Sequence, residues 1–300
     1  MLQTYDERNK DLLINVNGVL QHRDAARISP FDSVVQGGDA VWEGLRVYDG
    51  RIFKLDEHLQ RLRHSALALA FDRIPSKESL VAEIERTLEA NEMHDGVHIR
   101  LTLTRGEKVT SGMDPRLNQA GPTLIVLAEW KPPVYDKHGV RLVTASVRRP
   151  GPAVMDPKIH HNNLLPSILA KLEANAAGAD DALVLDDRGF IAETNATHIF
   201  LVEDAGLATP TAAACPEGIT RATVLEICED QGIPCSVRDL SQAELYRAHE
   251  AFCTGTMGEL APVVEVDGRP IGGGEIGVMT KRLTDAYAER TASEGVVVVR

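Results

Sequence analysis

Residues 189–202 read GFIAETNATHIFLV, in which two apolar runs flank the short polar stretch E-T-N-A-T. The apolar runs are typical of buried strands, and the polar residues between them indicate a turn. Glu193 opens that turn. A carboxylate between two buried strands must be paired or must serve a ligand, because burying an uncompensated charge is costly. The partner or ligand of Glu193 must therefore be sought in the rest of the sequence.

The composition limits the kinds of partner that this chain can bind. It has 300 residues and a formal net charge of −12, which argues against nucleic acids and anionic membranes. The N-terminal segment is charged, without the apolar core of a signal peptide, and no apolar run is long enough to span a membrane. The cysteines show no metal-ligand spacing. We therefore expect a cytoplasmic protein without a metal site.

The order of strand and helix signals indicates the fold class. Strands come in runs with helices set between them, which favours two α+β domains over a doubly wound sheet. The segment KPPVYDKHG has the prolines, charges and glycine of an interdomain linker. We expect a smaller N-terminal α/β domain at 1–130, a linker at 131–138 and a larger C-terminal domain at 139–300.

Local signals predict several individual elements. Asn17-Gly18 and Asp49-Gly50 each lie between strand-like runs and predict hairpin turns. Asp56 is expected to cap one helix, and Pro75-Ser76 to begin the next. The runs VHIRLTLT and TLIVLAEW predict strands over 97–104 and 123–130.

Two small-residue motifs could hold a phosphate group. Gly218-Ile219-Thr220-Arg221 opens a predicted helix, where free amide N–H groups and the helix dipole attract anions. The run TGTMGE at 254–259 follows a strand and lets the backbone approach a ligand closely. Taken singly, the first motif is more often a plain helix start, and the second is as often an ordinary turn.

Lys158 lies in a third candidate stretch, MDPKIHHNNLLPS at 155–167. A lysine there could be a desolvated, reactive amine, although most lysines lie on the surface. His160 and His161 are adjacent, which is poor spacing for one metal ion. Glu193 alone would be read as a strand-end acid paired to an arginine. Together, however, a lysine, an acid and two phosphate-type turns are the parts that pyridoxal 5′-phosphate requires.

The order of these motifs resembles that of the class IV, or fold-type IV, pyridoxal-phosphate aminotransferases. The motifs are EHLQRL, K-x-x-x-N, GFIAETNAT, GITR and TGTxxExxPV, and they run through nearly the whole chain. Within the family the pattern is most similar to the branched-chain amino acid aminotransferases. The resemblance implies a two-domain fold of the D-amino acid aminotransferase type, an active site between the domains and a homodimer.

The resemblance also implies roles for individual residues. Lys158 would be the catalytic Schiff-base lysine, Glu193 the partner of the pyridine nitrogen, and Arg61 a phosphate ligand. The other residues implied to contact the cofactor are Thr194, Asn195, Ile219, Thr220, Gly255, Thr256 and Asn163. Those implied to contact the substrate are Trp42, Arg46, His98, Arg100, Thr256 and Met257.

The implied reaction is a ping-pong transamination from a branched-chain or other hydrophobic L-amino acid to a 2-oxo acid, with 2-oxoglutarate as the expected acceptor. Thr110 and Gly112 stand where D-amino acid enzymes bind a carboxylate, which speaks against that specificity. Asn163, His98 and Gly37 replace tyrosines of the branched-chain pattern. A D-amino acid or (R)-amine transaminase and an aminodeoxychorismate lyase therefore stay open as alternatives, with a cofactor-free binding protein as the remote one.

Overall fold

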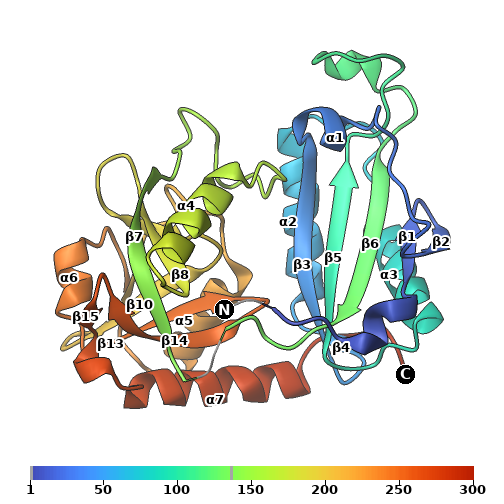
Figure 1. The fold of residues 1–300 in the computed structure, drawn as a ribbon. Coiled ribbons are helices and arrows are strands. Elements are labelled where there is room, and N and C mark those ends of the chain that lie inside the picture. Colours follow the sequence, from blue (N-terminus) through green and yellow to red (C-terminus); the bar gives the residue numbers. More distant parts are fainter. Residues whose placement is uncertain (1–2, 136–137) are drawn as a thin grey trace. The chain divides into compact units, whose positions relative to one another are not determined.

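The computed structural model describes residues 3–135 and 138–300 (Figure 1). Within these residues the chain forms two compact units. The first unit contains 3–132, 159–163 and 291–300, and the second contains the described residues of 133–158 together with 164–290. Residues 136 and 137, which fall in the expected linker, lie outside the described residues.

The first unit is built on a seven-stranded sheet with the order β16-β4-β3-β5-β6-β1-β2, in which the neighbouring strands run antiparallel. Its strands are β1 (Leu13–Val16), β2 (Val19–His22), β3 (Ala40–Tyr48), β4 (Arg51–Ile52), β5 (Val97–Thr104), β6 (Thr123–Trp130) and β16 (Val296–Val297). Its helical segments are η1 (Glu7–Asp11), α1 (Ser33–Gly37), α2 (Leu55–Ala68), α3 (Lys77–Ala90) and η2 (Pro115–Leu117).

Side-chain alternation decides which face of this sheet is buried. In β5, Val97 and Ile99 belong to the hydrophobic core, so His98 and Arg100 point to the opposite face. Helices α2 and α3 pack on the core face (Figure 1). The residues that they bury there include Leu59, Leu62, Leu80, Ile84 and Leu88. The face away from these helices therefore carries Arg46 of β3 and His98 and Arg100 of β5.

Both predicted hairpin turns of the first unit are present. Asn17 and Gly18 have φ of 50° and 78°, and Asp49 and Gly50 have φ of 44° and 75°. Consecutive positive φ angles match the right-handed twist of the flanking strands. The strands predicted over 97–104 and 123–130 have those bounds in β5 and β6.

The predicted helix starts were right in one case and wrong in the other. Ser76 caps α3, accepting a hydrogen bond from the backbone N–H of Ser79 at 3.2 Å. Asp56 does not cap α2, because Lys54, with a φ of 53°, is the N-cap and the helix begins at Leu55. The carboxylate of Asp56 instead lies in the first turn, where the helix dipole favours negative charge.

The second unit contains a nine-stranded mixed sheet with the order β12-β11-β10-β13-β14-β7-β8-β9, and β15 pairs with β14. Its strands are β7 (Val140–Arg148), β8 (Asp181–Leu185), β9 (Ile191–Thr194), β10 (His198–Glu203), β11 (Gly206–Thr209), β12 (Cys235–Val237), β13 (Glu250–Gly255), β14 (Glu259–Val266) and β15 (Arg269–Pro270). Its helical segments are α4 (Leu165–Ala176), α5 (Ile219–Asp230), α6 (Gln242–Tyr246), η3 (Gly272–Gly274) and α7 (Val278–Ser293).

Strand β10 is central to the second unit. It is antiparallel to β11 on one side and to β13 on the other, and its residues 198–202 are buried. Helix α5 packs on the same sheet, against β13 and β12. The neighbouring strands β11 and β13 therefore hold β10 in place within the sheet. The candidate site lies at the start of β10. No helix among the described residues is long and apolar enough to cross a membrane.

Candidate functional site

Glu193 is buried at the end of β9, with 6% of its surface exposed. Its Oε1 lies 2.7 Å from Nε of Arg149, in an ion pair whose N–H is not aligned as a hydrogen bond. Burial raises the pKa of Glu193 to about 7, and Arg149 opposes that rise. The carboxyl group can therefore hold or release a proton near neutral pH.

The turn after Glu193 is closed by its own side chains. The hydroxyl oxygens of Thr194 and Thr197 are 2.7 Å apart, and the backbone N–H of Thr194 donates to the carbonyl of Thr197. Asn195 Oδ1 accepts from the backbone N–H of Ala182 at 2.9 Å. Small polar residues suit this position because they satisfy backbone groups that the turn would otherwise leave unpaired.

Arg149 was not anticipated from the sequence, although it organises this turn. One guanidinium nitrogen donates to the carbonyl oxygens of Thr194 and Asn195, each at 3.0 Å. Another donates to the hydroxyl of Ser167 at 3.0 Å. Arg149 lies outside every motif, and only the tertiary structure places it beside Glu193.

Helix α5 begins with its backbone amides uncapped by a side chain. Gly218 is the N-cap, and Ile219 and Thr220 form the first turn, as the GITR motif predicted. A Cβ at position 218 would lie 2.2 Å from the ring of His198, so only glycine fits there without a shift. An uncapped helix start offers free N–H donors and a positive dipole end to an anion.

The turn between β13 and β14 lies beside the other two motifs. Thr254 pairs with His198 in the antiparallel register of β13 and β10. A Cβ at Gly255 would lie 2.9 Å from Cγ2 of Thr197, which requires a close approach of the two turns. The structure thus gathers three sequence motifs, those of Glu193, Gly218 and Thr254, around the start of β10.

Thr254 provides a test of whether this corner fits a phosphate-bearing cofactor. The residue is fully buried, and its hydroxyl oxygen has no hydrogen-bond partner among the described residues. Buried hydroxyl groups are normally hydrogen-bonded. The hydroxyl of Thr254 and the backbone N–H groups at the uncapped start of α5 together form a set of hydrogen-bond donors that suits a bound phosphate. Thr256 and Met257 follow in the same turn, and the carbonyl of Met257 accepts from Val134 N–H at 3.0 Å.

Lys158 is exposed rather than desolvated, which differs from the sequence expectation. Its backbone N–H donates to Asp156 Oδ1 at 3.0 Å. The residue lies in an irregular segment after Pro157, in neither a helix nor a strand.

In the first unit, Arg61 is held by a buried carboxylate that the sequence analysis missed. Nε and one Nη of Arg61 each donate to Glu43 at 2.7 Å, and His58 Nδ1 lies 2.6 Å from the same carboxylate. Burial opposes the charge of Glu43, but Arg61, His160 and His58 hold its pKa well below the usual range. The guanidinium orientation of Arg61 is therefore fixed by Glu43.

His160 joins this network from the segment that follows Lys158. Its backbone carbonyl accepts from Trp42 N–H at 3.0 Å, and its ring stacks on Trp42 with centroids 4.5 Å apart. Burial and the charge of Arg61 lower the pKa of His160 to about 4. His160 is thus a neutral packing residue at neutral pH. Among the described residues, no group of three or more His, Cys, Asp or Glu side chains could hold a metal ion.

The predicted substrate residues of β3 and β5 share the face away from α2 and α3. Arg100 lies over the ring of Trp42, with Cζ 3.6 Å from the centroid, and donates to Asn162 Oδ1 at 3.0 Å. Arg46 is buried and donates to the carbonyl of Lys131 at 3.2 Å. His98 stands opposite Arg46 in the register of the two strands.

Asn163 lies near these residues in the first unit. Its side-chain amide donates to the carbonyl of Gly38 at 3.2 Å, and the residue is exposed. Gly37 has open space where a Cβ would be built. The positions that carry tyrosines in the branched-chain pattern are thus filled by smaller or more polar groups.

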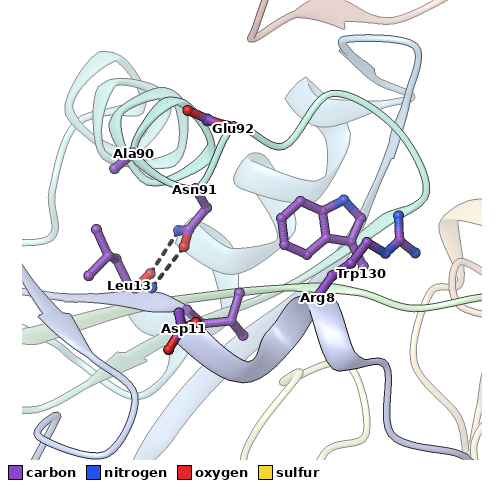
Figure 2. Close-up of a pocket in the computed structure, with 8 residues that line it drawn as sticks. Arg8, Asp11, Leu13, Ala90, Asn91, Glu92 and Trp130 are labelled. Atoms are coloured by element: carbon purple, nitrogen blue, oxygen red, sulfur yellow. Dashed lines mark hydrogen bonds between the residues drawn. The ribbon is translucent and has the colours of Figure 1, made fainter.

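A separate pocket of about 330 Å³ lies elsewhere in the first unit (Figure 2). The side-chain amide of Asn91, which lines the pocket, accepts from the backbone N–H of Leu13 at 2.8 Å and donates to the carbonyl of Leu13 at 2.9 Å. Arg8 lies 5.2 Å from the ring of Trp130 and is paired with Asp6. The pocket includes none of the predicted site residues.

Comparison with protein families matches residues 40–266 to the class IV amino-transferases. The Arabidopsis thaliana protein described as branched-chain-amino-acid aminotransferase-like protein 2 is 55% identical over 97% of this chain. The match covers 52% of that protein, so this chain spans about half the length of that relative. A putative branched-chain-amino-acid aminotransferase of Methanocaldococcus jannaschii is 38% identical, over 95% of this chain and 98% of its own.

Solved structures that are similar to this chain are also branched-chain amino acid aminotransferases. A branched-chain amino acid aminotransferase complexed with N-(5′-phosphopyridoxyl)-L-glutamate, from the organism abbreviated T.th., has a TM-score of 0.87 and 34% identity, over 94% of this chain and 95% of its own. An Escherichia coli branched-chain amino acid aminotransferase has a TM-score of 0.89 and 28% identity, over 96% and 97% of the two chains.

Proposed function

Because this chain belongs to the class IV aminotransferase family, we propose that it moves an amino group from a branched-chain or other hydrophobic L-amino acid to a 2-oxo acid. The proposed acceptor is 2-oxoglutarate. The observation that carries this proposal is the gathering of three motifs around the start of β10, with the buried carboxyl of Glu193 among them. The substrate class is proposed from the names of the relatives and from the cationic face of β3 and β5.

Enzymes of this family use pyridoxal 5′-phosphate, which supplies an electron sink for the carbanion formed at the substrate Cα. The residues of the second unit fit that group. Thr254 offers a buried hydroxyl that has no hydrogen-bond partner in the described part of the chain, and the start of α5 offers backbone amides that no side chain caps. We propose Ile219, Thr220, Gly255 and Thr256 as the phosphate-binding set, with Thr194 and Asn195 lining the cofactor beside Glu193.

Glu193 would hold a proton on the pyridine nitrogen. Its carboxyl has a pKa of about 7 in the protein alone, so a cationic ring nitrogen placed against it would favour the charged carboxylate. Arg149 would hold the carboxylate in place through its ion pair.

Lys158 would hold the cofactor covalently through Nζ, and the same amine, when free, would move the proton. Its Nζ would accept the proton from the substrate Cα and return it to the cofactor carbon. Arg61 would add a phosphate contact, with its guanidinium oriented by Glu43. Asn163 can donate to the phenolic oxygen of the cofactor in place of a tyrosine.

On the substrate side we propose Trp42, Arg46, His98, Arg100 and Met257 as contacts. Two guanidinium groups on one sheet face favour a substrate that bears a carboxylate. A second candidate is a transaminase for D-amino acids, since a D-alanine aminotransferase of Bacillus licheniformis is 31% identical over 93% of this chain. Gly37, His98 and Asn163 stand where the branched-chain pattern has tyrosines, and this difference is compatible with the second candidate.

The proposed function is tested with the purified enzyme and a panel of amino donors. L-leucine, L-valine, D-alanine and an (R)-amine are each offered with 2-oxoglutarate or pyruvate, and the new amino acid is measured. The proposal predicts the fastest transfer from the branched-chain donors to 2-oxoglutarate. Transfer from D-alanine alone would replace it with the second candidate, and pyruvate release from aminodeoxychorismate without an acceptor would identify a lyase. We also expect a homodimer, to be measured by light scattering.

A further inference from the structure

Tyr135 lies against the turn that joins β13 to β14, residues 255–258. A Cβ at Gly258 would lie 2.2 Å from Cδ2 of Tyr135, so the tyrosine ring packs directly on the backbone of this turn. The backbone N–H of Val134 donates to the carbonyl of Met257 at 3.0 Å, and Gly258 N–H donates to the carbonyl of Gly255 at 3.1 Å. The segment before β7 therefore supports one of the three motifs of the candidate site, within the second unit.

The hydroxyl of Tyr135 donates to a buried carboxylate. Its acceptor is Oδ2 of Asp181, at 2.5 Å, and Asp181 is 3% exposed. Nζ of Lys171 lies 3.4 Å from the other oxygen of that carboxylate. Burial, together with the charge of Asp181, raises the pKa of Tyr135 well above its usual value. The phenol therefore keeps its proton at physiological pH and acts as the donor.

The residue that follows Asp181 in β8 holds the turn after β9. Ala182 N–H donates to Oδ1 of Asn195, and the carbonyl of Ala182 accepts from Asn195 N–H, both at 2.9 Å. Two consecutive residues of β8 thus support two of the motifs. Ala182 holds the turn that contains Asn195, and Asp181 holds the 255–258 turn through Tyr135.

The hydrogen bond between Tyr135 and Asp181 does more than fill space. A phenylalanine and an apolar partner would fill the same volume without burying a charge, and such replacements are often neutral or stabilising. A hydrogen bond to a carboxylate is short and directional. It therefore fixes the angle and distance at which the tyrosine ring meets the backbone of Gly258, which apolar packing alone would leave adjustable.

We propose that Tyr135, anchored by Asp181, is a positioning residue that holds the 255–258 turn where it can bind the phosphate of the cofactor. This inference rests on the proposed phosphate-binding set, and it adds the pair that keeps part of that set in place. Tyr135 acts through Gly255 and Thr256 rather than by touching the cofactor. Its loss should therefore weaken the contribution of the phosphate to cofactor binding and leave the other contributions unchanged.

The test compares two ligands that differ only in the phosphate. The cofactor-free full chain is titrated with pyridoxal 5′-phosphate and, separately, with pyridoxal, and binding is followed by visible absorption without any amino donor. Tyr135→Phe keeps the ring and removes the hydroxyl. We expect it to weaken pyridoxal 5′-phosphate by about tenfold and to leave pyridoxal within about twofold of the wild type, since hydrogen bonds to charged groups are the strong ones.

A second variant and a matched control accompany it. Asp181→Asn keeps the shape of the anchor and removes its charge, so it should show the same selective loss in smaller measure, about threefold. Tyr246→Phe is the control, because Tyr246 also donates to a carboxylate of the second unit, that of Asp267 at 2.7 Å, but belongs to none of the three motifs. It should change the affinity for neither ligand.

Three results would overturn the inference. In the first, Tyr135→Phe leaves the affinity for pyridoxal 5′-phosphate within about twofold of the wild type. In the second, it weakens both ligands equally, as a general loosening of the fold would. In the third, Tyr246→Phe has the same selective effect.

Thermal unfolding of each cofactor-free variant shows whether it is folded. If Tyr135→Phe does not fold, Asp181→Asn decides the question through the same pair of affinities, and an equal loss for both ligands overturns the inference. The proposed function fails separately. A wild-type protein that binds pyridoxal 5′-phosphate but transfers no amino group from any donor would refute the transaminase and leave this comparison of affinities intact.

Discussion

Replacing Glu193 by Gln should change stability in opposite directions with and without cofactor. Without cofactor, the carboxyl has a pKa of about 7 in the folded chain against an ordinary value of 4.5. This gap of about 2.5 corresponds to about 3 kcal/mol, at about 1.4 kcal/mol for each pKa unit. Because the folded pKa is the higher one, the stabilisation is full below about pH 4.5 and is lost as the pH rises through about 7.

Glutamine resembles the protonated carboxyl and does not titrate, so the variant escapes that loss. After the cofactor has been removed, chemical unfolding should show wild type and Glu193→Gln similar near about pH 5 and the variant more stable by about 3 kcal/mol near about pH 8.5. With pyridoxal 5′-phosphate bound, the order should reverse, because only the carboxylate pairs with a protonated ring nitrogen. Asp187→Asn, which removes an exposed acid two residues after Leu185 of β8, is the control.

Two results would contradict these expectations. If cofactor-free Glu193→Gln is no more stable than wild type near about pH 8.5, burial does not hold the carboxyl protonated, and Arg149 alone determines its charge. If the cofactor stabilises both proteins equally, Glu193 does not contact the ring nitrogen.

Three further substitutions test other parts of the site. Gly218→Ala places a Cβ 2.2 Å from the ring of His198. We expect the free energy of unfolding, measured by thermal unfolding, to fall by about 1–3 kcal/mol and cofactor binding to weaken. An unchanged melting temperature would contradict the close approach of Gly218 to His198. Glu43→Gln removes the charge that pairs with Arg61, and chemical unfolding should show that the free energy of unfolding falls by about 3 kcal/mol. A fall of less than about 1 kcal/mol would mean that the stability of this network does not depend on the charge of Glu43. Thr254→Val removes a hydroxyl that has no hydrogen-bond partner within residues 3–135 and 138–300, so the cofactor-free protein should keep its stability. Cofactor affinity, measured by spectroscopic titration, should fall about tenfold, and an unchanged affinity would remove Thr254 from the phosphate site.

The sequence predicted those features that depend on short-range chemistry. The Asn17-Gly18 and Asp49-Gly50 turns need consecutive positive φ angles, which these residue types tolerate. The alternation in 97–104 and the apolar run at 123–130 predicted β5 and β6 with their full bounds. The family resemblance was confirmed by the match to class IV amino-transferases, and with it the fold class and the cofactor.

Features that depend on tertiary contacts could not be predicted. The helix start at Lys54 requires a left-handed residue that no sequence signal marks, so Asp56 was wrongly expected to cap α2. Strand β16, two residues long, is defined only by its pairing with β4. Arg149 lies in no motif, and Glu43 was given no role, because each acquires its role from a partner distant in the sequence.

The visible absorption spectrum of the purified protein, before and after L-leucine, tests the proposed transaminase function most directly. We predict a cofactor band that bleaches with L-leucine and returns with 2-oxoglutarate, and no such cycle in Lys158→Ala. A cofactor band that ignores L-leucine but bleaches with D-alanine would contradict the proposed donor class. Cycling that survives in Lys158→Ala would contradict the assignment of Lys158, and a protein that takes up no pyridoxal 5′-phosphate would contradict the proposed chemistry itself.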